Sequence, residues 1–100
     1  MEMIRKGRMV GNRVVDEFWW KHQGEYYIVH IGFQSDLCTF YPDRFWEACV
    51  LHDYLLHTGA NRKKADKLFE LAVLSLGASR FEAKIMYIGV RIGAIATKLF

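Results

Sequence analysis

Residues 45–69, FWEACVLHDYLLHTGANRKKADKLF, contain the two apolar runs that decide how this chain folds. A Thr-Gly-Ala break at 58–60 separates the runs, because glycine is the usual residue just past the end of a helix. Asn61 is a suitable N-cap for a second helix that extends to Leu76. Two helices joined by so short a link are expected to lie antiparallel and in contact.

The first run places two titratable residues, His52 and Asp53, in a helix that is apolar nearly all round. At about 100° per residue, apolar side chains flank His52 on both sides. A buried carboxylate must be ion-paired, hydrogen-bonded or metal-bound, because burying it alone costs several kcal/mol. In a purely structural interpretation His52 is a hydrogen-bonded core residue. Asp53 then pairs with an arginine, for which the sequence offers Arg44, Arg62 and Arg91.

The second run adds Asp66, at the edge of an apolar face and flanked by Phe69 and Val73. Antiparallel pairing of the two helices should bring Asp66 to His52, so we expect a direct contact or a bridge through one water molecule. A carboxylate on a histidine fixes the tautomer of the ring and raises its basicity, as a general base requires. The sequence therefore predicts a catalytic pair formed by His52 and Asp66.

A series of motifs follows in order from Gly32 to Phe69: Gly-Phe, Ser-Asp, Pro-x-Arg-Phe-Trp, Ala-x-x-x-His-Asp-Tyr-Leu-Leu and Gly-x-x-Arg-x-x-Ala-Asp-x-Leu-Phe. A later stretch with Tyr87 and Arg91 continues it, and together they resemble the phage-borne family known as domain of unknown function 1353. Two motifs of this chain differ from the usual sequence pattern of that family. Its usual Ser-x-Pro-Arg approach to the Phe-Trp pair is replaced by residues 39–44, TFYPDR, and its common aromatic at the end of the His-Asp motif is Leu56.

The His-Asp motif, followed by a later Asp before a Phe, is also similar to the active-site helix pair of phospholipases of the A-two type. That resemblance implies that His52 activates water, Asp53 holds a divalent cation such as calcium, and Asp66 orients the histidine. Residues 32–36 are the candidate for a cation-binding loop, which makes Asp36 a second metal ligand. A second enzyme interpretation is the ligand order of the His-Asp phosphohydrolases, carried by His30, His52-Asp53 and Asp66.

Composition limits the other classes of protein. One hundred residues suffice for one domain, residues 1–100, with a modest core. A net charge of +3 falls short of the dense basic patch of a nucleic-acid binder. Cys38 and Cys49 lack the spacing of a metal or redox motif, so we expect reduced thiols in a cytosolic protein. Arg91 interrupts the last apolar segment, and no transmembrane helix is expected.

The flanking segments complete the predicted fold. Residues 13–20 and 25–31 are β-rich and are joined by Lys-His-Gln-Gly, which predicts a hairpin. A last helix over 80–99 begins with a capping box formed by Ser79 and Glu82. This helix either packs in the core or lies on an anionic membrane surface. Leu71 and Leu74 point away from the main face of the preceding helix, toward the last helix or toward another copy in a homo-oligomer.

These patterns predict an α+β fold, with a small N-terminal β-hairpin packed on a three-helix core. The favoured function is metal-assisted hydrolysis of an ester or phosphoester at His52, Asp53 and Asp66. The alternative is a non-catalytic phage accessory protein that binds a host or virion partner and uses the same residues as a buried polar network. Either role places the protein in the cytoplasm of an infected bacterium or in the virion.

Overall fold

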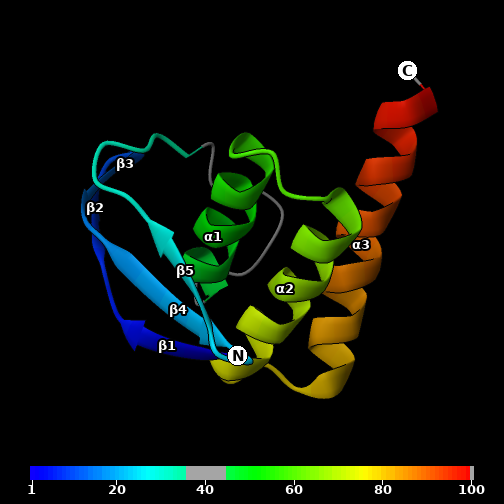
Figure 1. The fold of residues 1–100 in the computed structure, drawn as a ribbon. Coiled ribbons are helices and arrows are strands. Elements are labelled where there is room, and N and C mark those ends of the chain that lie inside the picture. Colours follow the sequence, from blue (N-terminus) through cyan, green and yellow to red (C-terminus); the bar gives the residue numbers. More distant parts are fainter. Residues whose placement is uncertain (36–44, 100) are drawn as a thin grey trace.

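The computed structural model describes residues 1–35 and 45–99, with side chains described as far as residue 93. Five short strands come first and three helices follow, so the α+β fold class is confirmed (Figure 1). The strands form two antiparallel sheets, β1-β4-β5 and β2-β3. Their bounds are β1 Glu2–Arg5, β2 Arg8–Val10, β3 Arg13–Asp16, β4 Phe18–His22 and β5 Glu25–Val29.

The predicted hairpin is formed by β4 and β5, whose paired ends are His22 and Glu25. Gln23 and Gly24 make the turn, with φ angles of 50° and 80°. Two-residue hairpin turns with positive φ match the right-handed twist of the strands that they connect. This local fit explains why the sequence was sufficient to place the hairpin.

The N-terminal part contains more strands than the predicted hairpin. The β-rich stretch over residues 13–20 divides at Glu17 into β3 and β4, which belong to different sheets. Gly7 lies opposite this division, between β1 and β2. A Cβ atom at Gly7 would collide with the carbonyl oxygen of Asp16 and lie 2.7 Å from the Phe18 ring. The close approach of the two chain segments therefore requires glycine here.

The helices are α1 Trp46–His57, α2 Arg62–Ser75 and α3 Arg80–Leu99. Asn61 caps α2 by accepting a hydrogen bond from the Lys64 backbone N–H, as predicted. Ser79 and Glu82 form the predicted capping box of α3, each side chain bonding the backbone N–H of the other residue. Helix α2 packs between α1 and α3, and α1 contacts strand β5 (Figure 1).

One continuous core joins the strands to the helices. Phe18 packs its ring edge-on against Trp46 of α1, with the ring centroids 5.4 Å apart. The largest fully buried apolar side chains come from the strands, from α1 with its preceding residue, and from α2: Val14, Phe18, Trp20, Val29, Phe45, Val50, Leu51, Phe69 and Val73. This core fixes α1 and α2 against each other, and they carry the predicted site residues.

Cys49 lies in the buried part of α1 and is disulfide-bonded. The expectation of a reduced thiol is therefore wrong for Cys49, because neither the spacing nor the composition of the sequence signals a disulfide. Cys38, the other cysteine of the chain, lies outside the described residues. Among the described residues, no helix has the length and apolar character needed to cross a bilayer.

A candidate His-Asp site between three helices

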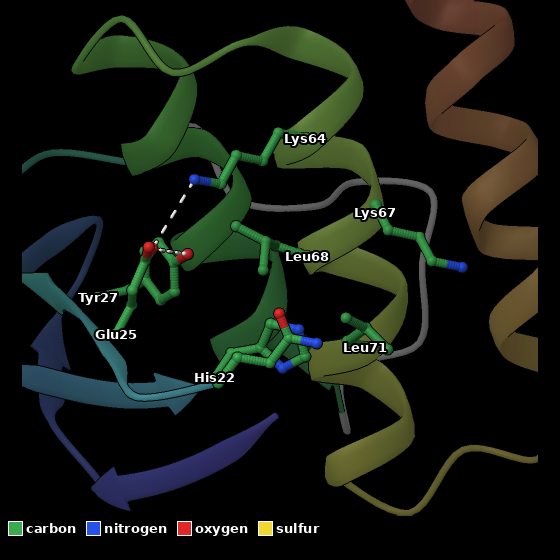
Figure 2. A pocket seen from close by; sticks show the side chains of 8 residues that line it. His22, Glu25, Tyr27, Lys64, Lys67, Leu68 and Leu71 are labelled. Atoms are coloured by element: carbon green, nitrogen blue, oxygen red, sulfur yellow. Dashed lines mark hydrogen bonds and ion pairs between the residues drawn. The ribbon is translucent and has the colours of Figure 1, made fainter.

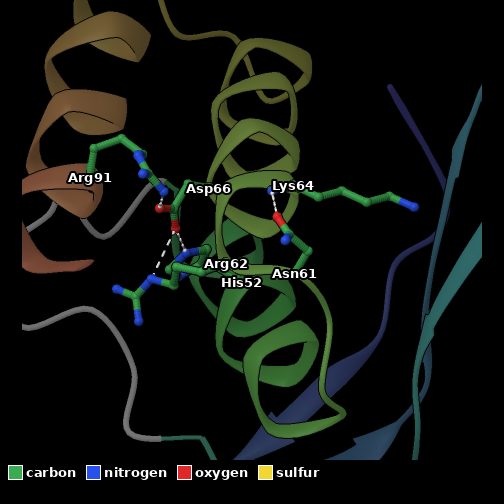
Figure 3. A network of polar contacts seen from close by, with 6 residues as sticks. All are labelled: His52, Asn61, Arg62, Lys64, Asp66 and Arg91. Atoms are coloured by element: carbon green, nitrogen blue, oxygen red, sulfur yellow. Dashed lines mark hydrogen bonds and ion pairs between the residues drawn. The ribbon is translucent and has the colours of Figure 1, made fainter. Parts of the chain in front are cut away.

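The centre of the site is the carboxylate of Asp66, on the first half of α2, whose side chain is fully buried. Its Oδ1 lies 2.6 Å from His52 Nε2 on α1, and its Oδ2 accepts a hydrogen bond of 2.9 Å from Arg91 Nη1 on α3 (Figure 3). The predicted contact between His52 and Asp66 is thus confirmed. The structure adds Arg91, so all three helices meet at one carboxylate.

Arg62 provides a second cation at Asp66, one helical turn earlier on α2. Its Nε lies 3.4 Å from Asp66 Oδ1, within ion-pair distance, although the geometry does not make a hydrogen bond. The Arg62 side chain stays 37 % exposed. Two guanidinium groups compensate the negative charge of this buried carboxylate. Asp66 therefore acts as a hydrogen-bond acceptor toward His52.

The protonation of His52 follows from this arrangement. An ionised Asp66 only accepts, so His52 Nε2 carries the proton that it shares with Oδ1. Burial is the largest influence on the ring and lowers the pKa of His52 below 6.5. The hydrogen bond and charge of Asp66 act in the opposite direction but are outweighed. At neutral pH His52 is therefore a neutral ring, protonated at Nε2 and with a lone pair at Nδ1.

The Nδ1 atom of His52 is the chemically available end of the ring. Among the described residues, the hydrogen bonds of His52 involve Nε2 alone. The ring packs against Phe69, with centroids 5.2 Å apart, and the side chain is 12 % exposed. A neutral imidazole that is oriented by a carboxylate at one nitrogen and unoccupied at the other has the form of a general base.

Asp53 occupies a separate, neighbouring cluster. Its Oδ2 accepts a hydrogen bond of 2.9 Å from Ser35 Oγ, and its Oδ1 lies 3.2 Å from His57 Nε2 one turn further along α1. Arg62 and Arg91, which the structural interpretation offered as partners of Asp53, turn to Asp66 instead. Ser35 is almost fully buried although it follows the strands in an irregular connection.

The ligand set for a divalent cation is incomplete in the part of the chain that can be described. Within residues 1–35 and 45–93, no three His, Cys, Asp or Glu side chains are grouped closely enough to hold a metal ion. Asp53 is the described candidate ligand, and Asp36 lies outside the described residues. Asp66 is an unsuitable ligand because its oxygens already face His52, Arg62 and Arg91.

His30 does not join this site. Its Nδ1 lies 2.8 Å from Glu17 Oε2, at an exposed position, and its ring meets the edge of Tyr54. The ligand order His30, His52-Asp53 and Asp66 therefore lacks the common centre that a phosphohydrolase metal site needs. The sequence order alone could not reveal this, because His30 follows β5 on the sheet side of α1.

A small pocket of about 230 Å³ lies elsewhere, between the β4–β5 turn and α2 (Figure 2). Lys64 reaches across it toward Glu25, which also accepts a hydrogen bond from the hydroxyl group of Tyr27. Burial is the main cause that raises the pKa of Tyr27 to about 12. None of the predicted site residues lines this pocket.

Four residues of the two clusters were not assigned these roles by the sequence. Ser35 and His57 contact Asp53, and Arg62 and Arg91 contact Asp66. The i, i+4 spacing of Asp53 and His57 on one helix could have indicated their contact. The approach of Ser35 to α1 and of Arg91 to α2 depends on tertiary packing, for which the local sequence carries no signal.

Comparison with known proteins places the chain in a family. Neither the curated proteins nor the solved structures include a significant match. The family model for a protein of unknown function, DUF1353, matches residues 12–90, a range that contains the strands from β3 onward, α1, α2 and the residues His52, Asp53 and Asp66, and that ends one residue before Arg91. The chain therefore belongs to the DUF1353 family.

Proposed function

We propose that this protein is a hydrolase in which His52 is the general base and Asp66 orients it. The observation that carries the proposal is the contact of 2.6 Å between His52 Nε2 and a fully buried Asp66, which leaves Nδ1 available. Nδ1 would remove a proton from water, and the resulting hydroxide would attack the carbonyl carbon or phosphorus atom of an ester. The imidazolium would be stabilised by Asp66 and would return the proton to the leaving oxygen.

The position and charge of Arg62 favour a substrate that is an anion. Its guanidinium group lies beside the His52–Asp66 pair and is partly exposed, and Asp66 is already balanced by Arg91. A phosphodiester or a phospholipid headgroup could bind to the outward nitrogens of Arg62 through charge-assisted hydrogen bonds. We therefore expect phosphate-containing esters to be hydrolysed in preference to neutral esters of the same leaving group.

A divalent cation at Asp53 and Asp36 remains part of the proposal as a requirement to be measured. The described contacts of Asp53 do not complete a cation site, so the general-base step is written without the ion. Calcium or magnesium should raise the melting temperature of the parent protein in proportion to the logarithm of its concentration, if it binds the folded state. The Asp53→Asn variant should lose that response.

The test is a hydrolysis assay with bis-p-nitrophenyl phosphate, p-nitrophenyl acetate and a short-chain phospholipid, each in the presence of calcium and of a chelator. We expect turnover of a phosphate ester by the parent protein, loss of turnover in His52→Asn, and retention in His22→Asn. His22 lines the separate pocket and is the matched control. The acidic limb of the pH profile should lie below pH 6.5, because burial lowers the pKa of His52.

A non-catalytic role is favoured by one observation, the saturation of Asp66 by two guanidinium groups and a histidine. Such a network can serve to fix three helices and nothing more. In that role the protein would be an accessory protein that binds a host or virion partner. Absence of turnover with all three substrates, with and without calcium, in a protein that is folded would favour this second function over the hydrolase.

A further inference from the structure

Helix α3 carries an exposed apolar stripe that the core does not use. We call it the α3 seam, and it consists of Phe81, Ile85, Ile88 and Ile92, which are between 49 % and 75 % exposed. The residues that α3 contributes to the core are Ala83, Met86 and Val90. At about 100° per residue these two stripes lie on nearly opposite sides of the helix. The seam is therefore a second apolar face, separate from the one that packs on α2.

The spacing within the seam has the pattern of a coiled coil. Its residues are four, three and four positions apart, and the sequence continues this alternation with Ile95 and Leu99. Apolar residues that repeat every 3.5 positions keep facing a partner helix along its length. Figure 1 shows the C-terminal end of α3 projecting past the ends of α1 and α2, which leaves that part of the helix accessible to another chain.

We propose that the α3 seam binds the α3 seam of a second copy of this chain, in parallel orientation. In a parallel pair the edge that carries Lys84 and Arg91 meets the opposite edge of the partner helix, which carries Glu82 and Gly89. An antiparallel pair would instead place the basic edges against each other. Lys84 and Arg91 are also balanced within their own chain, by Glu70 and Asp66.

The apolar area of the seam agrees with a weak, reversible interface. Four side chains of this size at about half exposure present on the order of 300–400 Å² in each copy. Pairing two copies would bury roughly twice that area, which is below the roughly 1,200 Å² of a small stable interface and is typical of weak, transient association. A patch of this size is within the range of the largest apolar patch on a monomer, and such patches are often binding surfaces.

A membrane surface fits the seam less well. Helices that lie on membranes combine an apolar face with a charged face that remains in water. The side of α3 opposite the seam is buried against the core, and Lys84 beside the seam is held by Glu70. Burial alone would raise the pKa of Glu70, but the hydrogen bonds and charges of Lys67 and Lys84 keep it below its ordinary value. Lys84, which lies beside the seam, is thus already ion-paired within its own chain.

The experiment is light scattering coupled to size-exclusion chromatography across a dilution series, with Ile88→Glu as the seam variant. Ile31→Glu is the matched control, because Ile31 is equally apolar and 64 % exposed but lies outside α3. A circular dichroism spectrum checks that each variant is folded, and Ile85→Gln is a milder second variant. We expect the parent and Ile31→Glu to self-associate and both seam variants to shift to monomers.

Three results would overturn the proposal. The parent protein could remain monomeric at its highest soluble concentration, or the seam variants could associate like the parent. The third result is a monomer that sediments with vesicles of phosphatidylserine and phosphatidylcholine and loses this binding in Ile88→Glu, which would assign the seam to a membrane surface.

Discussion

At the scale of single residues, Asp66 is the position on which the geometry depends most. It is fully buried and has partners on α1, on α3 and in its own helix. Replacing it by asparagine would leave two guanidinium groups beside a neutral amide. Breaking a buried pair by removing one partner costs roughly 3–5 kcal/mol, whereas an exposed pair contributes at most about 1 kcal/mol.

We therefore expect Asp66→Asn to lower the free energy of unfolding by about 3–5 kcal/mol. The matched control is Asp16→Asn, which removes a contact of 3.0 Å to Arg8 between two exposed side chains and should cost at most about 1 kcal/mol. Denaturant curves for the parent and the two variants make the comparison. Equal small losses in both variants would mean that the Asp66 network is not the ion pair described above.

His52 makes the stability of the folded protein decrease as the pH falls. Its pKa in the folded state is lowered below the ordinary value of 6.5, chiefly by burial. As the pH falls below 6.5 the unfolded chain binds a proton at this site before the folded chain does, so the folded state loses stability. His52 costs no stability well above pH 6.5. Below that pH the free energy of unfolding falls by up to about 1.4 kcal/mol for each pH unit, until the folded state also binds the proton.

Unfolding curves measured at intervals from pH 7.5 down to the acid limit of the fold check this expectation. The decline below pH 6.5 should be shallower in His52→Asn than in His22→Asn, which keeps the buried ring. Parallel declines in the two variants would show that another group causes the acid sensitivity.

At the scale of the elements, caps and turns were the features that the sequence predicted well. Asn61, Ser79 and Glu82 act through hydrogen bonds to backbone within three residues, so local patterns are enough to find them. The pairing of β1 with β4 joins residues that are 14 to 19 positions apart, from Arg5 with Trp19 to Glu2 with Lys21, and the division at Glu17 depends on the neighbouring sheet. No local pattern carries that information, and the N-terminal strands were therefore incompletely predicted.

Gly7 offers a test of the close approach between the two sheets. Alanine at this position would place a Cβ atom against the Asp16 carbonyl oxygen and the Phe18 ring, both part of the packed strands. We expect Gly7→Ala to cost on the order of 1–3 kcal/mol, as overpacking does. Gly93→Ala is the control in α3, because the nearest atom to the new Cβ would be 3.9 Å away. Alanine in this helix should raise the free energy of unfolding by at most about 1 kcal/mol. A Gly7→Ala variant with an unchanged free energy of unfolding would contradict this account of the sheet junction.

At the scale of the whole molecule, the contact between His52 and Asp66 was predictable because it follows from two local features of the sequence. A short link makes α1 and α2 antiparallel neighbours, and helical periodicity places both residues on the facing sides. Arg91 comes from α3, 25 positions from Asp66, and its role follows only from the packing of the third helix. The sequence was therefore sufficient to predict the contact between His52 and Asp66, but not the additional contact with Arg91.

The central claim is that His52 is a neutral ring held at Nε2 by Asp66, with a free lone pair at Nδ1. The most direct measurement is a two-bond ¹H–¹⁵N NMR spectrum of the imidazole rings, titrated through neutral pH and assigned with His52→Asn. We predict a ring protonated at Nε2 and unprotonated at Nδ1 at pH 7, with a pKa below 6.5. A ring protonated at Nδ1, or one that is doubly protonated at pH 7, would contradict the general-base account.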